Sequence, residues 1–193
     1  MHSDWPTCPP VSADDAGPAS SERRIWLRGM LAATIAASAA GWPVLARANS
    51  LELGKPAPPL VLHTLDGRRI ATEDLHGQVV ILTFWATWCD PCREELPLLS
   101  AYAARHANQG LHVLGFSLDG PENLAAVRQV AAGLSFPVGF LGSAWAGDYG
   151  RMWRIPVSFA IDRAGRLVYN GWDDKQPSWT AESLERIVTP LLG

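Results

Sequence analysis

The feature that most limits the fold of this chain is an apolar run that ends just before a pair of cysteines. The run covers residues 79–85, and Cys89 and Cys92 follow it. Its length and composition are typical of a buried strand. Apolar residues at helical spacing come next, among them Leu96 and Leu99. The pattern therefore predicts that Cys89 lies where a strand ends and a helix begins.

A helix N-terminus suits cysteine chemistry. The free main-chain N–H groups and the helix dipole favour an anion there, and the thiolate is such an anion. Pro91 fits the first turn, where its missing N–H is not needed. Disulfide exchange requires one thiolate that attacks and a second thiol that resolves the mixed disulfide. We expect Cys89 to be the exposed attacker and Cys92, one turn further on, to be the more buried resolving thiol.

A Cys-x-x-Cys pair is ambiguous by itself, because it can also be half of a zinc site or an inert disulfide. Zinc takes four ligands, whereas the third cysteine, Cys8, lies far upstream and the later histidines show no ligand spacing. A disulfide between such near neighbours constrains the unfolded chain little. A redox dithiol is therefore favoured over both alternatives, with no metal and no cofactor.

The residues around the cysteines resemble a known family. Residues 84–97 read FWATWCDPCREELP. This string resembles the thioredoxin superfamily and, within it, the TlpA/ResA-like periplasmic thiol–disulfide oxidoreductases. The resemblance covers about residues 53–192. It implies an α/β thioredoxin fold, in which helices flank a central mixed sheet, and an activity of thiol–disulfide exchange.

The resemblance also implies a substrate-binding surface. In thioredoxin-like folds a cis proline faces the cysteine pair, and Ile155-Pro156 matches it by its place before a predicted strand pair. The peptide before that proline can offer main-chain N–H and C=O groups to an extended substrate. An ordinary trans proline at a strand entry is the alternative. We assign Trp88 and Pro91 to the same surface, and note Val157 where Thr is common.

A carboxylate for proton transfer is expected at Glu95. Plain thioredoxins carry a buried acid on the central strand, where this chain has Thr83. TlpA/ResA-like proteins often have a carboxylate three residues after the second cysteine, on the same helix face, and Glu95 stands there. The alternative is a surface glutamate like Glu94. Because Asp90 and Glu95 would oppose a nearby thiolate, the pattern also predicts a reductant.

The rest of the chain yields a coarse order of elements. An Asp66-Gly67 turn predicts an N-terminal β-hairpin, which is added to the plain thioredoxin fold. An apolar run follows the first helix and predicts a parallel strand. That strand covers residues 111–116. The further expected elements are a helix from Pro121 to Gly133, an extended piece at 136–141, antiparallel strands at 157–161 and 167–169, and a helix at 180–192.

Two groups of large side chains each allow two interpretations. Trp145, Tyr149 and Met152 recur at helical spacing, which favours a short amphipathic helix on the sheet over an aromatic substrate face. Trp172 and Trp179 flank a polar loop. They could pack the loop or contact a partner.

Residues 1–48 resemble an export leader. Arg23-Arg24 precedes an alanine-rich apolar stretch at 29–45, and Ala46-Arg47-Ala48 offers small residues to a signal peptidase. The paired arginines resemble a twin-arginine signal, and an uncleaved N-terminal membrane anchor is the alternative. Residues 49–193 then form the thioredoxin-like domain in the periplasm. A net charge of −3 gives no basic field for nucleic acid.

The predicted function is reduction of client protein disulfides outside the cytoplasm. The resemblance implies a membrane thiol reductant supplier as partner. It allows three kinds of client: those of cytochrome c biogenesis, copper-site assembly proteins, and proteins in need of general disulfide repair. A thiol peroxidase of related fold is one alternative, but it needs Pro and Thr where Leu82 and Ala86 stand. A metallochaperone-like copper-site assembly protein is another alternative. Such a protein needs Cys-x-x-x-Cys spacing and a partnering histidine, and no histidine of this chain stands in a recognised motif.

Overall fold

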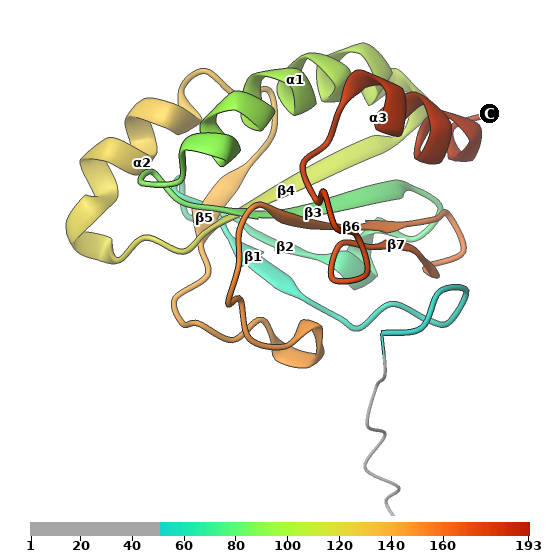
Figure 1. Ribbon diagram of the computed structural model, residues 1–193, viewed down its shortest axis with the longest axis horizontal. Coiled ribbons are helices and arrows are strands. Elements are labelled where there is room, and N and C mark those ends of the chain that lie inside the picture. Colours follow the sequence, from blue (N-terminus) through green and yellow to red (C-terminus); the bar gives the residue numbers. More distant parts are fainter. Residues whose placement is uncertain (1–50) are drawn as a thin grey trace, which may run out of the picture. The chain divides into compact units, whose positions relative to one another are not determined.

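The computed structural model describes residues 51–193 (Figure 1). The expectations for the leader, residues 1–48, lie outside the described residues. The strands are β1 (Val61–His63), β2 (Arg69–Ala71), β3 (Val79–Trp85), β4 (Leu111–Ser117), β5 (Val138–Phe140), β6 (Val157–Ile161) and β7 (Leu167–Asn170). The α-helices are α1 (Asp90–His106), α2 (Leu124–Ala131) and α3 (Ala181–Ile187), and short 3-10 turns occur at 72–75, 107–109, 121–123, 147–149 and 189–191.

The central sheet is mixed and has five strands in the order β5-β4-β3-β6-β7. β3 pairs in parallel with β4, which pairs in parallel with β5, while β6 is antiparallel to both β3 and β7. Every residue of β3 is buried, because both faces of the sheet are covered. This arrangement confirms the predicted thioredoxin fold.

The two faces of the sheet are covered differently. Ile81 and Trp85 of β3 pack with residues of α1, α2 and α3. Leu82 and Phe84, which point the other way, pack with the N-terminal segment and with residues 146–152. Figure 1 shows α1 and α3 over one face and the β1–β2 hairpin beyond the other. The α-helices therefore gather on the face that carries the cysteine motif.

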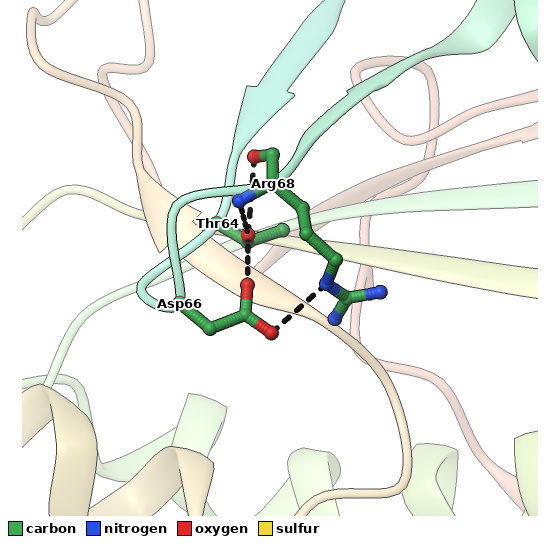
Figure 2. Close-up of polar contacts among 3 residues, drawn as sticks. All are labelled: Thr64, Asp66 and Arg68. Carbon is green, nitrogen blue, oxygen red and sulfur yellow. Dashed lines mark hydrogen bonds and ion pairs between the residues drawn. The ribbon is translucent and has the colours of Figure 1, made fainter.

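The predicted hairpin is confirmed, and side chains in its turn stabilise it. β1 and β2 pair antiparallel around the turn. Figure 2 shows the Thr64 hydroxyl donating to the Asp66 carboxylate and accepting from the Arg68 N–H (2.9 Å), while Arg68 Nε donates to Asp66 (2.9 Å). Thr64 also forms a bridge with Gly139 of β5. The hairpin is thus attached to the β5 edge of the sheet.

One predicted helix is wrong, and another is shorter than predicted. Residues 145–152 form no α-helix but a tight loop with one 3-10 turn, in which Trp145 is bridged to Arg151. Gly147 and Gly150 both adopt positive φ there, which a helix does not allow. The last helix ends at Ile187 and only a 3-10 turn follows, because Pro190 lacks the N–H that an α-helix interior requires.

The remaining elements agree with the sequence. α1 ends before Gly110, which adopts the left-handed conformation, and the extended piece at 136–141 contains β5. No helix among residues 51–193 is both long and apolar enough to span a membrane.

Candidate functional site

Cys89 and Cys92 lie at the N-terminus of α1 and are joined by a disulfide. Cys89 is the N-cap residue, and its sulfur accepts a hydrogen bond from the Cys92 N–H (3.2 Å). Both residues are buried, with Cys89 6% and Cys92 1% exposed. The expectation of an exposed Cys89 is therefore wrong for this oxidised form, although Cys89 remains the more accessible of the two. The bonded sulfur points into the first turn, and this covers it.

The loop between β3 and α1 is held by a buried carboxylate. Asp119, just beyond β4, accepts hydrogen bonds from the Thr87 N–H (2.8 Å), the Thr87 hydroxyl (2.6 Å) and the Ser117 hydroxyl (2.7 Å). Asp119 is itself buried. Because Thr87 lies two residues before Cys89, these bonds fix the approach to the motif.

Strand direction brings the proline segment to the same end of the sheet as the cysteines. β6 is antiparallel to β3, so its first residue, Val157, pairs with Phe84 near the end of β3. The Ile155–Pro156 peptide bond directly before it is cis. Pro156 is buried and Ile155 is half-buried. The cis geometry of this bond confirms what the resemblance implies.

The other two residues assigned to the substrate surface are exposed. Trp88 is 66% exposed, and Pro91 is exposed in the first turn of α1. Trp88 borders a cleft of about 660 Å³ whose apolar walls include Leu118, Phe140 and Met152. An exposed tryptophan beside an apolar cleft is suited to contact with another polypeptide.

Glu95 is buried and is not a surface glutamate. It is 4% exposed, whereas its neighbour Glu94 is exposed. One carboxylate oxygen, Oε2, accepts a hydrogen bond from the Trp179 N–H (3.1 Å), and the other has no hydrogen-bond partner among residues 51–193. Burial raises the pKa of Glu95 to about 8, and the Trp179 amide and the nearby Ser178 hydroxyl oppose this rise.

The raised pKa corrects one expectation from the sequence. Glu95 was expected to oppose a nearby thiolate as an anion. A carboxyl group with a pKa of about 8 is protonated at neutral pH and carries no charge there. Asp90 is also compensated, because Arg93 Nη2 lies 2.6 Å from its carboxylate. At neutral pH Glu95 therefore carries no charge that would repel a thiolate.

Comparison with known proteins agrees with this site. The AhpC/TSA family profile matches residues 53–170. A thiol-disulfide oxidoreductase ResA from Bacillus thuringiensis (strain Al Hakam) is 36% identical over 123 residues, which cover 62% of this chain and 69% of the relative. The chain belongs to the AhpC/TSA family and is a ResA/TlpA-like member of the thioredoxin superfamily.

Further similarities support the same family. The ResA of Bacillus subtilis (strain 168) is 32% identical over 127 residues, 65% of this chain and 70% of the relative. A solved thiol:disulfide interchange protein of the thioredoxin family from Chlorobium tepidum TLS superposes with a TM-score of 0.60 and 28% identity, and covers 75% of this chain and 99% of its own. This ResA/TlpA-like protein is accordingly an oxidoreductase that acts on disulfides.

The structure adds three residues to the site of this ResA/TlpA-like protein: sequence reasoning assigned no role to Asp119 or Arg154, and it left the role of Trp179 open. Asp119 holds the motif loop, the main chain of Trp179 contacts Glu95, and Arg154 contacts the loop that carries Trp179. Each of these contacts joins residues that lie at least 20 positions apart in the sequence. The only local signal was the position of Arg154, which directly precedes Ile155-Pro156.

Proposed function

We propose that this protein reduces disulfides of client proteins outside the cytoplasm, through the Cys89–Cys92 dithiol. The observation that carries the proposal is Glu95. It lies one helical turn beyond Cys92, is buried, and has a pKa of about 8. Such a group can take and return a proton near neutral pH, which disulfide exchange requires when a thiol becomes a nucleophile.

The reaction proceeds in two exchanges. The Cys89 thiolate attacks one sulfur of the client disulfide, forms a mixed disulfide and displaces the other client sulfur as a thiolate. Glu95, protonated at rest, gives its proton to the displaced client thiolate. The resulting Glu95 carboxylate then accepts the proton of Cys92, and Cys92 attacks the Cys89 sulfur. This forms the Cys89–Cys92 disulfide and releases the second client thiolate. The client gains two electrons and the dithiol loses two. Glu95 recovers its proton from Cys92, and the second client thiolate takes from solvent the proton that Cys89 released when it ionised.

Reduction is the direction that the motif supports. A couple becomes oxidising when the thiolate is stabilised, because this stabilises the reduced protein. Between the cysteines stand Asp90 and Pro91, with no cation, and the nearby Arg93 is engaged with Asp90. We expect a reduction potential nearer about −270 mV than about −120 mV. Equilibration with glutathione, read by mass spectrometry, measures it, and a value near the upper figure would contradict a reductase.

The compartment and the upstream partner are inferred from the sequence. The twin-arginine-like leader or anchor at residues 1–48 supports export to the periplasm, with residues 49–193 as the working domain. An oxidising compartment would keep an exported dithiol oxidised. A membrane thiol reductant supplier is therefore required for turnover. The clients proposed are exported proteins with disulfides, those of cytochrome c biogenesis among them.

The client strand is proposed to dock at the end of the sheet that carries the cysteines. Ile155 and Pro156 would offer main-chain groups to an extended strand, and Trp88 and Pro91 would supply apolar contact. All four lie at segments that flank the strand ends described above.

Trapping tests the roles of the two cysteines. In full-length protein, Cys92→Ser should accumulate mixed disulfides with clients through Cys89, and Cys89→Ser should accumulate none. Mass spectrometry of non-reduced adducts maps the bond. Adducts that map to Cys92 would reverse the assigned roles. Consumption of hydrogen peroxide without any client adduct would instead support the thiol peroxidase alternative.

A further inference from the structure

Arg154 binds the start of the loop that connects β7 to α3. One nitrogen of its guanidinium, Nη2, lies within hydrogen-bond distance of three carbonyl oxygens, those of Gly171 (2.7 Å), Trp172 (2.9 Å) and Asp174 (2.9 Å). The guanidinium also lies over the ring of Trp172, at 5.7 Å from its centroid. A single half-buried side chain thus contacts three of the four residues 171–174.

The same segment is pressed against β6. The Gly171 N–H donates to the Ser158 carbonyl oxygen (2.9 Å), and a Cβ at Gly171 would lie only 2.4 Å from that oxygen. Arg154 precedes β6 by three residues. These contacts therefore connect three segments: the residues before Pro156, the start of β6, and the start of the β7–α3 loop.

The far end of the β7–α3 loop reaches Glu95. The Trp179 N–H donates to Glu95 Oε2 (3.1 Å), and the Trp179 ring packs on Tyr169 of β7, with 4.6 Å between centroids. The Tyr169 hydroxyl in turn donates to the Asp174 carboxylate (2.9 Å). Asp174 links the two ends of the loop, because Arg154 binds its carbonyl oxygen and Tyr169 binds its carboxylate.

We propose that Arg154 is a positioning residue. It connects the segment of Ile155 and Pro156, where the client is proposed to dock, to the β7–α3 loop, and it thereby keeps Trp179 in contact with Glu95. This inference rests on the proposed function, in which Glu95 carries the proton. Among residues 51–193, Arg154 forms no hydrogen bond with the cysteines or with Glu95. It acts through the loop.

The shape of the arginine side chain is essential to this role. A guanidinium is planar and can stack on an indole ring while one of its nitrogens, here Nη2, reaches the carbonyl oxygens. Arg154 lies over both Trp153 (5.2 Å) and Trp172 (5.7 Å), whose rings stack on each other at 5.5 Å. A lysine keeps the charge but presents a compact ammonium without the plane. Arg154→Lys should therefore behave like Arg154→Ala.

Glu95 reports directly on the state of the loop. Its surroundings are Cys92 on its own helix, Trp179 and Ser178 from the β7–α3 loop, and Tyr169 from β7. Burial is the main cause of its raised pKa. If the loop loosens, water reaches the carboxylate and the pKa falls toward the ordinary value of 4.5. Loss of the Trp179 hydrogen bond alone would raise it, so the direction of the shift reveals whether Trp179 has opened.

The experiment is a titration of the Glu95 carboxyl carbon by NMR in the oxidised full-length protein, with the signal assigned from Glu95→Gln. Arg154→Ala and Arg154→Lys should each lower the midpoint by about one pH unit or more. Arg151→Ala is the matched control, since Arg151 is exposed on the same segment and its side chain forms no hydrogen bond within residues 51–193. It should leave the midpoint unchanged.

A midpoint that stays at the wild-type value, or that rises, in both folded Arg154 variants overturns the proposal. An intact Cys89–Cys92 disulfide and a native amide spectrum identify the folded variants, and the lysine variant serves if the alanine variant does not fold. The titration requires no client. A wild-type protein that forms no client adduct would therefore refute the proposed function, while the midpoints would still decide the role of Arg154.

Discussion

Replacement of the buried Glu95 by glutamine should stabilise the protein by an amount that grows with pH. The folded state holds the Glu95 proton up to about pH 8, whereas the unfolded chain loses it near 4.5. Between these values the unfolded state binds fewer protons, so the stability of the wild type falls as pH rises through this window. Below pH 4.5 both states are protonated and the penalty is absent. Glutamine, being neutral and of similar shape, carries no such penalty at any pH.

The size of the effect follows from the width of the window. Each pKa unit corresponds to about 1.4 kcal/mol, so the Glu95 penalty should be about 3 kcal/mol at pH 7 and approach about 5 kcal/mol above pH 8. The group is almost wholly buried, so solvent screening removes little of this. Relative to the wild type, Glu95→Gln should gain about 1.4 kcal/mol for each pH unit between 5 and 8.

Urea unfolding of the oxidised protein at pH 5, 6, 7 and 8 measures this difference. Glu94→Gln is the matched control, because it removes an exposed carboxylate from the adjacent position of α1. It should follow the wild-type pH dependence. Titration of the histidines cancels when each variant is subtracted from the wild type. A Glu95→Gln difference that is constant across the four pH values would refute a protonated, buried Glu95.

Three further substitutions test other parts of the structure. Asp119→Ala should destabilise the protein by about 1–3 kcal/mol in urea unfolding, because it leaves the half-buried Thr87 N–H and the Thr87 and Ser117 hydroxyls without their acceptor; a neutral result would show that the motif loop does not depend on Asp119. Trp88→Ala should raise the KM for a client several-fold and change stability by less than about 0.5 kcal/mol, since the ring is exposed; steady-state kinetics with an unchanged KM would exclude it from docking. Gly139→Ala should cost more than about 2 kcal/mol, because a Cβ would lie 1.9 Å from the His63 carbonyl oxygen; a wild-type melting temperature would mean that the hairpin is not packed there.

Local pattern was sufficient for most of the fold. The apolar run at 79–85, the Asp66-Gly67 turn and the stop at Gly110 predicted β3, the hairpin and the end of α1. Local pattern gave a wrong prediction where the prediction depended on residue spacing alone. Trp145, Tyr149 and Met152 have helical spacing, but two glycines of positive φ make the segment a loop.

The candidate site was predictable only in part. Its chemistry was visible because cysteine, proline and carboxylate stand close together along the chain, at residues 88–95. The residues that contact this motif in the folded protein could not be predicted from the sequence. Asp119 lies 32 residues from Thr87, and Trp179 lies 84 residues from Glu95.

The sequence by itself determined where the dithiol lies, at the junction of a buried strand and a helix, because strand and helix periodicity and the Cys-x-x-Cys spacing are local properties of the chain. Only the tertiary structure decided whether Glu95 is a surface carboxylate or a buried acid. Helical spacing places Glu95 on the face of Cys92, but its pKa depends on what covers that face. The cover is Trp179, brought there by the β7–α3 loop. No local pattern around residue 95 reports a contact made through folding of a distant segment.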